Sequence, residues 1–241
     1  METAFERSVN RWLVEHSVFD GTTLKLLAMA AMFMDHVAIT LLARAYQMNG
    51  VSVSGLNLLD FWYRILRAFG RLAFPIFVFL LVEGMKHTSD ERRYLTRLFF
   101  FALVSELPFD LALDGGLGLT HQNVFFTLTL GAVVIQLMKR RTSCEEQLAV
   151  VTTAAIFAQL CHFDYGAYGI LLAAIFWWFY DNRIRGTVLG CLLFLLEPYS
   201  ALGFVTILFY NGRRGVELRY FFYLFYPLHL FGLYFMWHNL M

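Results

Sequence analysis

The chain has 241 residues, of which 59% are hydrophobic and only 15% are charged. Soluble domains average about 45–50% apolar and about 25% charged residues, so a water-soluble globule of this size could not hide so much apolar surface. The excess is expected to face lipid, and we predict an all-α polytopic membrane protein. The net charge of +1 gives no electrostatic reason to expect nucleic acid as a partner.

Residues 1–22 are polar, mixed in charge and without a small-residue cleavage site, so they do not predict a signal peptide. This stretch predicts a short interfacial helix on the membrane surface, because one helical face carries Phe5, Val9, Trp12 and Leu13. The cysteines are odd in number and lie in or beside apolar runs, which favours buried thiols over disulfides or metal ligands. They are Cys144, Cys161 and Cys191.

Apolar runs, compared with the roughly 20 residues that cross a bilayer, predict about nine transmembrane helices. Their expected ranges are 23–43, 59–85, 93–113, 122–138, 146–162, 165–181, 186–197, 199–211 and 217–239. The seventh and eighth are short and flank Glu197 and Pro198, so they form either two thin spans or a re-entrant pair. Without a visible repeat or a long loop, residues 23–241 are expected to form one transmembrane domain.

Most of the 19 lysines and arginines lie at the N-terminal end or in alternate loops. The positive-inside rule assigns that side to the cytoplasm. We therefore expect a multi-pass protein of a bacterial cytoplasmic (inner) membrane, with its N-terminus cytoplasmic and its C-terminus extracytoplasmic.

Ionisable side chains inside the predicted spans mark candidate sites, because each costs about 2.5–3.5 kcal/mol at the bilayer centre. Lys25 and His36 are three helical turns apart, so they share a face, with His36 about 16 Å deeper. A cation above a buried imidazole could hold the phosphates of a long ligand whose reactive end reaches His36. Asp35 lies about 100° away and should pair elsewhere, most naturally with an arginine, so His36 is expected to be oriented from another span.

Arg64, Arg67 and Arg71 recur at i, i+3 and i+7 on the second predicted span. This stripe is expected to face the bundle interior, because guanidinium groups facing lipid would be prohibitive. Snorkelling is the simpler interpretation of Arg64 alone. Arg71, near the middle of the run, indicates a functional cavity.

Two carboxylates add to this set. Glu83 lies near the inner end of the second span, and Glu106 lies in the third, where Pro108 frees a backbone carbonyl and creates a polar notch. Glu106 is a candidate to orient or charge-balance His36. The alternative is that both carboxylates only neutralise arginines of the stripe.

His229 follows Pro227 in the ninth span, near mid-depth and beside another freed carbonyl. The chain has no Gly-rich phosphate loop, H-E-x-x-H, paired C-x-x-C or G-x-S-x-G motif. ATP hydrolysis, metalloprotease chemistry and elbow-type serine hydrolysis therefore find no support, and no metal is expected.

Successive blocks over roughly residues 23–235 resemble the TraX family, in family order. The blocks are KLLAMAAMFMDHVA, RILRAFGRLAFPIFVFLLVEGMKHT, RYLTRLFFFALVSELPFDLAL, QNVFFTLTLGAVV, DYGAYGILL, YNGRRG and RYFFYLFYPLHLF. The founding member of that family is associated with N-terminal acetylation of conjugative pilin. This sequence looks more like the broad bacterial branch of the family.

TraX proteins are in turn similar to a wider group of membrane acyltransferases that includes the acyltransferase-3 family. That group carries a basic residue, ten intervening positions and a histidine in its first core helix, plus an Arg-x-x-Arg element. Lys25 and His36 match the first pattern, with lysine in place of arginine, and Arg64 and Arg67 match the second. The resemblance implies His36 as catalytic base and acyl-coenzyme A as donor. Lysine keeps the phosphate-binding charge but loses bidentate geometry.

These features together predict an integral-membrane acetyltransferase. Acetyl-CoA would donate to an amine or hydroxyl of an envelope polymer, a lipid-linked molecule or a pilin-like peptide, with His36 as general base or acyl carrier and Asn123 or Arg71 stabilising the oxyanion. The expected catalytic residues are His36, Asp35, Glu106 and Arg71, and the expected donor-binding residues are Lys25, Arg67, Arg64, Asn123, Glu83 and His229. The alternatives are a small proton-coupled transporter, despite the absence of visible repeats, and a catalytically silent assembly partner.

Overall fold

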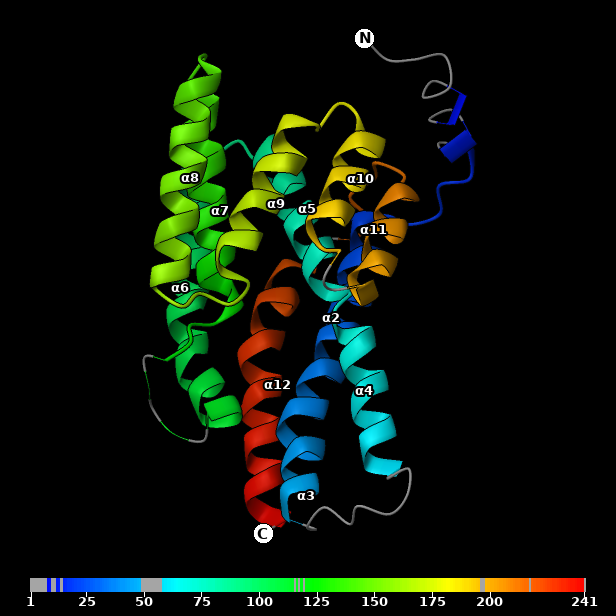
Figure 1. Ribbon diagram of the computed structural model, residues 1–241, viewed down its shortest axis with the longest axis vertical. Coiled ribbons are helices and arrows are strands. Elements are labelled where there is room, and N and C mark those ends of the chain that lie inside the picture. The colour runs from blue at the N-terminus through cyan, green and yellow to red at the C-terminus, as the bar shows by residue number, and fades with distance from the viewer. Residues whose placement is uncertain are drawn as a thin grey trace.

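The computed structural model is helical throughout the part of the chain that it describes, apart from two isolated β-bridges (Figure 1). It describes residues 8–9, 12–13, 15–48, 58–114, 116, 118, 120–195, 198–216 and 218–240. Much of the predicted interfacial segment, Phe5 included, lies outside the described residues, and so does Glu197.

Each of the nine sequence ranges contains a helix in the described structure. In chain order these are α2 (Gly21–Val37), which continues through a π-helical stretch (Ala38–Leu42) into α3 (Ala43–Met48), α4 (Leu58–Gly70), α5 (Ala73–His87), α6 (Glu91–Phe109) with a π-helical end (Asp110–Asp114), α7 (Val124–Lys139), α8 (Cys144–Leu160), α9 (Gly166–Trp178), α10 (Arg183–Leu193), α11 (Ala201–Leu208) after a 3₁₀ turn (Pro198–Ser200), and α12 (Arg219–Leu240).

Two helical runs, Gly21–Ala45 and Leu58–His87, are long and apolar enough to cross a membrane. By contrast, α10 and α11 have 11 and 8 residues. They span about 16 and 12 Å, less than the roughly 30 Å of a hydrocarbon core. The fold therefore supports membrane association, while nine separate crossings and the orientation of the termini stay predictions.

The second predicted span is not one uniform helix. Pro75 has no N–H, and its ring crowds the carbonyl of the residue four positions earlier, which is Arg71. The chain accordingly leaves α4 after Gly70 and enters α5 at Ala73. Arg71 lies in this short turn, but its N–H still donates to the carbonyl of Arg67 at 3.2 Å, so the helical path of the stripe continues through it.

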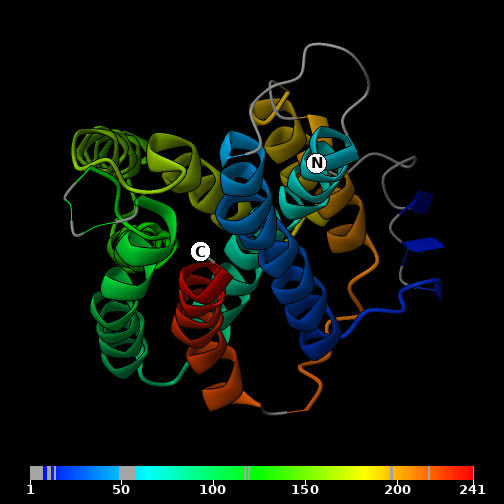
Figure 2. The same ribbon diagram turned by 90° about the horizontal axis from the view of Figure 1, so that it is seen from below.

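Helix α5 is the centre of the core. Phe74, Ile76, Val78 and Met85 are at most 2% exposed, and the helix packs against α2, α7, α9 and α11. On one side of α5, α12 lies between α2 and α6 (Figure 2) and contacts both. The two ends of α5 therefore face different cavities, which are described next.

Candidate functional site

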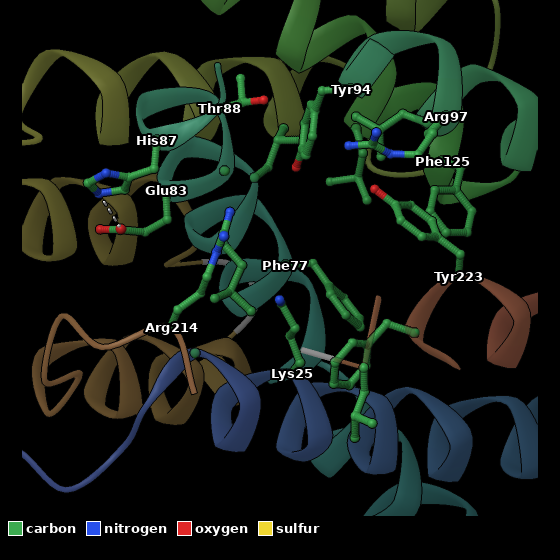
Figure 3. Close-up of a pocket in the computed structure, with 18 of the residues that line it drawn as sticks. Lys25, Phe77, Glu83, His87, Thr88, Tyr94, Arg97, Phe125, Arg214 and Tyr223 are labelled. Atoms are coloured by element: carbon green, nitrogen blue, oxygen red, sulfur yellow. Dashed lines mark ion pairs between the residues drawn. The ribbon is translucent and has the colours of Figure 1, made fainter. Parts of the chain in front are cut away.

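A cavity of about 750 Å³ opens beside the end of α5, between α2, α6, α7 and α12 (Figure 3). Its rim carries four basic side chains, which are Lys25, Arg93, Arg97 and Arg214. Its inner wall is mostly apolar and is formed by Met29, Met32, Leu81, Phe125, Leu128 and Tyr226. A basic rim above an apolar interior suits an amphipathic ligand with an anionic head.

Local contacts place the first two cations of the rim. Asp20 caps α2 by accepting a hydrogen bond from the backbone N–H of Thr23 at 2.7 Å, and hydrogen bonds from Thr23 lower the pKa of Asp20. The Thr22 hydroxyl donates to the carbonyl of Val216 at 2.7 Å, which ties the start of α2 to the segment before α12. Lys25 and Arg214 therefore point into the cavity from the same side (Figure 3).

The start of α6 supplies the opposite side of the rim. Asp90 caps this helix by accepting from the backbone N–H of Arg93 at 2.9 Å, so Tyr94 and Arg97 follow in the first two turns. Both point into the cavity (Figure 3). The Arg97 guanidinium lies 5.7 Å from the Tyr94 ring centroid, and its Nε is buried with no hydrogen-bond partner among the described residues. A buried donor without a partner is costly, which marks a place for an anionic ligand.

His36 lies one helical turn beyond Met32 and contacts α12. Its ring is nearly parallel to that of His229, at 8° and 4.9 Å between centroids, and meets it edge to edge, with its Nδ1 2.6 Å from Nε2 of His229. Lys25 also contacts α12, with its Nζ 5.1 Å from the Phe222 ring, so the two residues share a face as their spacing predicts. His36 is 8% exposed and does not line the cavity itself. Tyr226, which does, meets the His36 ring edge to face at 5.8 Å.

Asp35 pairs with an arginine, as predicted. Nη1 of Arg67 lies 2.5 Å from Oδ2 of Asp35, and the two side chains are 24% and 17% exposed. Gly70 permits this approach, because a Cβ there would lie 2.3 Å from the Asp35 side chain. Neither Arg67 nor Arg64 lines the basic-rimmed cavity. Arg64 does not face the interior with the rest of the stripe: its side chain is 77% exposed and pairs with Asp60 one turn earlier, which agrees with the snorkelling interpretation.

The two predicted carboxylates take other partners. Glu106 accepts from the backbone N–H of Asn123 at 3.2 Å and from its Nδ2 at 2.5 Å. It therefore does not orient His36, whose ring partner is His229. Asn123 also donates through Nδ2 to the carbonyl of Ala102 at 2.8 Å, so both amide hydrogens are used and its predicted oxyanion role finds no support.

Glu83 lies on the rim of the cavity and pairs with His87 at 3.3 Å. The alternative prediction, in which Glu83 and Glu106 neutralise Arg67 and Arg71, is wrong for Arg67, which pairs with Asp35. Glu83 and His87, near the end of α5, therefore belong to the rim of the cavity and not to the centre of the molecule.

Arg71 belongs to a second cavity, of about 430 Å³, at the start of α5. Asp164 and Tyr165, from the turn between α8 and α9, line it as well. Arg71 hydrogen-bonds Tyr165 and interacts electrostatically with Asp164. Burial raises the pKa of the Asp164 carboxyl to about 6, and the nearby Asp35 adds to this shift. The second cavity is therefore close enough to Asp35 for an electrostatic effect, whereas the first cavity reaches Met32 and Tyr226.

The model of the TraX protein family matches residues 20–237, nearly the whole described chain. The chain belongs to the TraX family. It is also similar to the probable fimbrial assembly protein FimC, serogroup H1, of Dichelobacter nodosus, with 29% identity over 243 residues, 88% of this chain and 93% of that protein. No solved structure matches. The TraX match includes every helix that builds the basic-rimmed cavity and the histidine pair.

Several site residues of this TraX-family chain escaped prediction. Arg97 and Arg214 counted only as loop charges in the positive-inside argument, and Tyr226 lay unremarked beside Pro227. The signal that was available is helical spacing: Tyr226 and His229 are three residues apart, so they share one face of α12.

Proposed function

We propose that this protein is a membrane acetyltransferase that transfers an acetyl group from acetyl-CoA to an amine or hydroxyl of an exported acceptor. The observation that carries the proposal is the cavity with a basic rim and a mostly apolar wall that includes Tyr226, which contacts His36. Its volume of about 750 Å³ lies within the range of ligand sites, roughly 300–1,000 Å³.

The polarity of the cavity matches that of the donor. Acetyl-CoA carries its phosphates at one end and its thioester at the other, joined by a flexible, mostly apolar arm. Lys25, Arg97 and Arg214 would hold the phosphates, and the unpaired Nε of Arg97 would gain an acceptor. The arm would pass Met29 and Met32 towards Tyr226, because Lys25 and His36 are about 16 Å apart along α2.

The chemistry needs one base and one oxyanion donor. The nitrogen or oxygen of the acceptor attacks the thioester carbonyl, and His36 takes the proton of that amine or hydroxyl. The new C–N or C–O bond forms, the C–S bond breaks, and the proton passes to the departing thiolate. Tyr226 accepts a hydrogen bond from the backbone N–H of Val124, so its own proton can be donated to the developing oxyanion.

The second cavity would admit the acceptor. Arg71, Asp164 and Tyr165 line it at the start of α5, whereas the donor cavity opens at the end of that helix. With the basic rim facing the cytoplasm of a bacterial inner membrane, the acceptor would approach from the far side. The fimbrial assembly relative supports a pilin-like or fimbrial peptide as acceptor. In this topology α10 and α11 form a re-entrant pair, because each is too short to cross alone.

The test is acetyl-CoA binding and acetyl transfer by the purified full-length protein in detergent. Arg97→Gln and Lys25→Gln should each weaken acetyl-CoA binding about tenfold or more, and His36→Ala should abolish transfer while leaving binding within about twofold. Arg64→Gln is the matched control, since it removes a guanidinium outside both cavities. Failure of the wild-type protein to bind acetyl-CoA, or equal loss of binding in Arg64→Gln, would refute the donor site.

A proton-coupled transporter is the second candidate. It is favoured by the two separate cavities together with the buried histidine pair and the Asp35–Arg67 ion pair, because ionisable groups inside a membrane often mark proton pathways. Transport would appear as proton-gradient-driven uptake into vesicles, with no need for acetyl-CoA and no covalent product.

A further inference from the structure

The proton positions in the histidine pair follow from its hydrogen-bond chain. Nδ1 of His229 is 2.7 Å from the carbonyl oxygen of Phe225, one turn earlier on α12. A carbonyl oxygen only accepts hydrogen bonds, so Nδ1 of His229 is the donor and carries the proton. In a neutral imidazole the other nitrogen then has the lone pair, so Nε2 of His229 accepts.

The same reasoning fixes the tautomer of His36. Its Nδ1 lies 2.6 Å from the accepting Nε2 of His229, so Nδ1 of His36 must carry the proton. Nε2 of a neutral His36 is therefore the unprotonated nitrogen. A general base needs such a nitrogen, and this hydrogen-bond chain supplies it at Nε2.

Packing holds both rings in these positions. Phe225 stacks on His229 at 4.7 Å on the same helix, and the His36 ring on α2 lies nearly coplanar with His229 at 4.9 Å between centroids. Both histidines are at most 9% exposed, so water has little access to compete for their nitrogens. Thr40 donates to the backbone carbonyl of His36 at 2.6 Å, where α2 passes into its π-helical stretch. Such stretches often occur at functional sites.

We propose that His229 is a positioning residue that holds His36 in the Nδ1–H tautomer, with Nε2 as the base; this assignment of the base rests on the acetyl-transfer function proposed above. When Nε2 takes the acceptor proton, His36 becomes an imidazolium whose Nδ1–H still donates to His229. When the tetrahedral intermediate collapses and its C–S bond breaks, Nε2 gives that proton to the departing thiolate and the original tautomer returns. A neutral hydrogen-bond acceptor such as His229 suits this depth, because it adds no second buried charge beside His36.

The first experiment reads the tautomer directly. The full-length protein with ¹⁵N-labelled histidine is prepared in detergent, and His36→Gln and His229→Gln identify the two sets of ring signals. The expected result is a protonated Nδ1 and a bare Nε2 on both rings. A His36 ring protonated at Nε2 overturns the proposal, whether or not the protein transfers acetyl groups. If the wild-type protein does not transfer acetyl groups, the proposed acetyltransferase function is refuted, while the tautomer measurement still tests the role of His229.

The second experiment separates positioning from folding. His229→Leu removes the nitrogen that accepts the hydrogen bond from His36. This variant should lower kcat about 100-fold with the KM for acetyl-CoA unchanged, and the His36 signals should be redistributed between tautomers. His229→Gln keeps an accepting oxygen and should recover most of kcat. His238→Leu, on an exposed part of the same helix, is the matched control and should leave kcat and the His36 signals unchanged. Equal losses in the Leu and Gln variants with an unchanged His36 tautomer would overturn the proposal.

Discussion

The Asp35–Arg67 ion pair provides the sharpest test of how α2 and α4 are held together. Replacing Arg67 with Met keeps most of the apolar stem but removes the guanidinium, which leaves Asp35 17% exposed and without this partner. Removing one member of a buried ion pair typically costs about 3–5 kcal/mol. Since both side chains keep some exposure, we expect a loss near the lower end, about 3 kcal/mol.

That loss is large enough to measure by thermal unfolding in detergent. For a chain of this length, about 1 kcal/mol corresponds to roughly 2–4 °C in Tm, so Arg67→Met should lower Tm by about 6–12 °C. Asp35→Asn with Arg67→Met completes a double-mutant cycle, and its combined loss should be smaller than the sum of the single losses, because the charges no longer lack partners.

Arg64→Met is the matched control for this cycle. Arg64 forms an exposed pair with Asp60 one turn earlier on the same helix. Such pairs contribute about 0.2–0.5 kcal/mol, so Tm should fall by less than about 2 °C. Equal shifts for Arg64→Met and Arg67→Met, or strictly additive losses in the cycle, would refute the buried pairing.

Three further predictions concern the helix contact, the pH dependence and the oxyanion donor. Gly70→Ala should destabilise the protein by about 1–3 kcal/mol in the same assay, because its Cβ would meet Asp35 at 2.3 Å; an unchanged Tm would contradict the close approach of α4 to α2. The hydrogen bond from Lys139 at 2.6 Å holds the pKa of Glu91 below 4.5, so its stabilisation is complete above about that pH and is lost as pH falls through the lowered folded-state value. Thermal scans at stepped acidic pH should therefore show a weaker acid dependence in Glu91→Gln, and identical profiles would count against the pair. Tyr226→Phe should lower kcat for acetyl transfer about 100-fold with acetyl-CoA affinity retained, and a loss of affinity alone would place Tyr226 in donor binding instead.

The region that matches the TraX family contains both cavities. Residues 20–237 match the TraX family, and within that region α5 separates a basic-rimmed cavity from one that contains Arg71 and Asp164. The first cavity is lined by Tyr226, which contacts His36, and the second holds Asp164, which Asp35 affects electrostatically. In the proposed function, the donor and the acceptor would each use one of these two cavities.

Sequence alone determined the positions of the helices. Apolar runs bounded by charged loops predicted nine ranges that each contain a helix, because the residues that can face lipid or the core are the same ones that fill these runs. It also placed Lys25 and His36 on one face and assigned an arginine to Asp35, because helical periodicity decides which side chains share a face.

Only the tertiary structure decided which helix lies opposite each face. His36 and His229 are 193 positions apart, and no spacing rule favours that contact over the predicted one with Glu106. Packing also placed Arg71 beside Asp164 and Tyr165 in a separate cavity, and the packing of α2, α6 and α12 brought Lys25, Arg97 and Arg214 to one rim. Periodicity acts within one helix, whereas these contacts depend on how the helices pack, and packing is a property of all the side chains together.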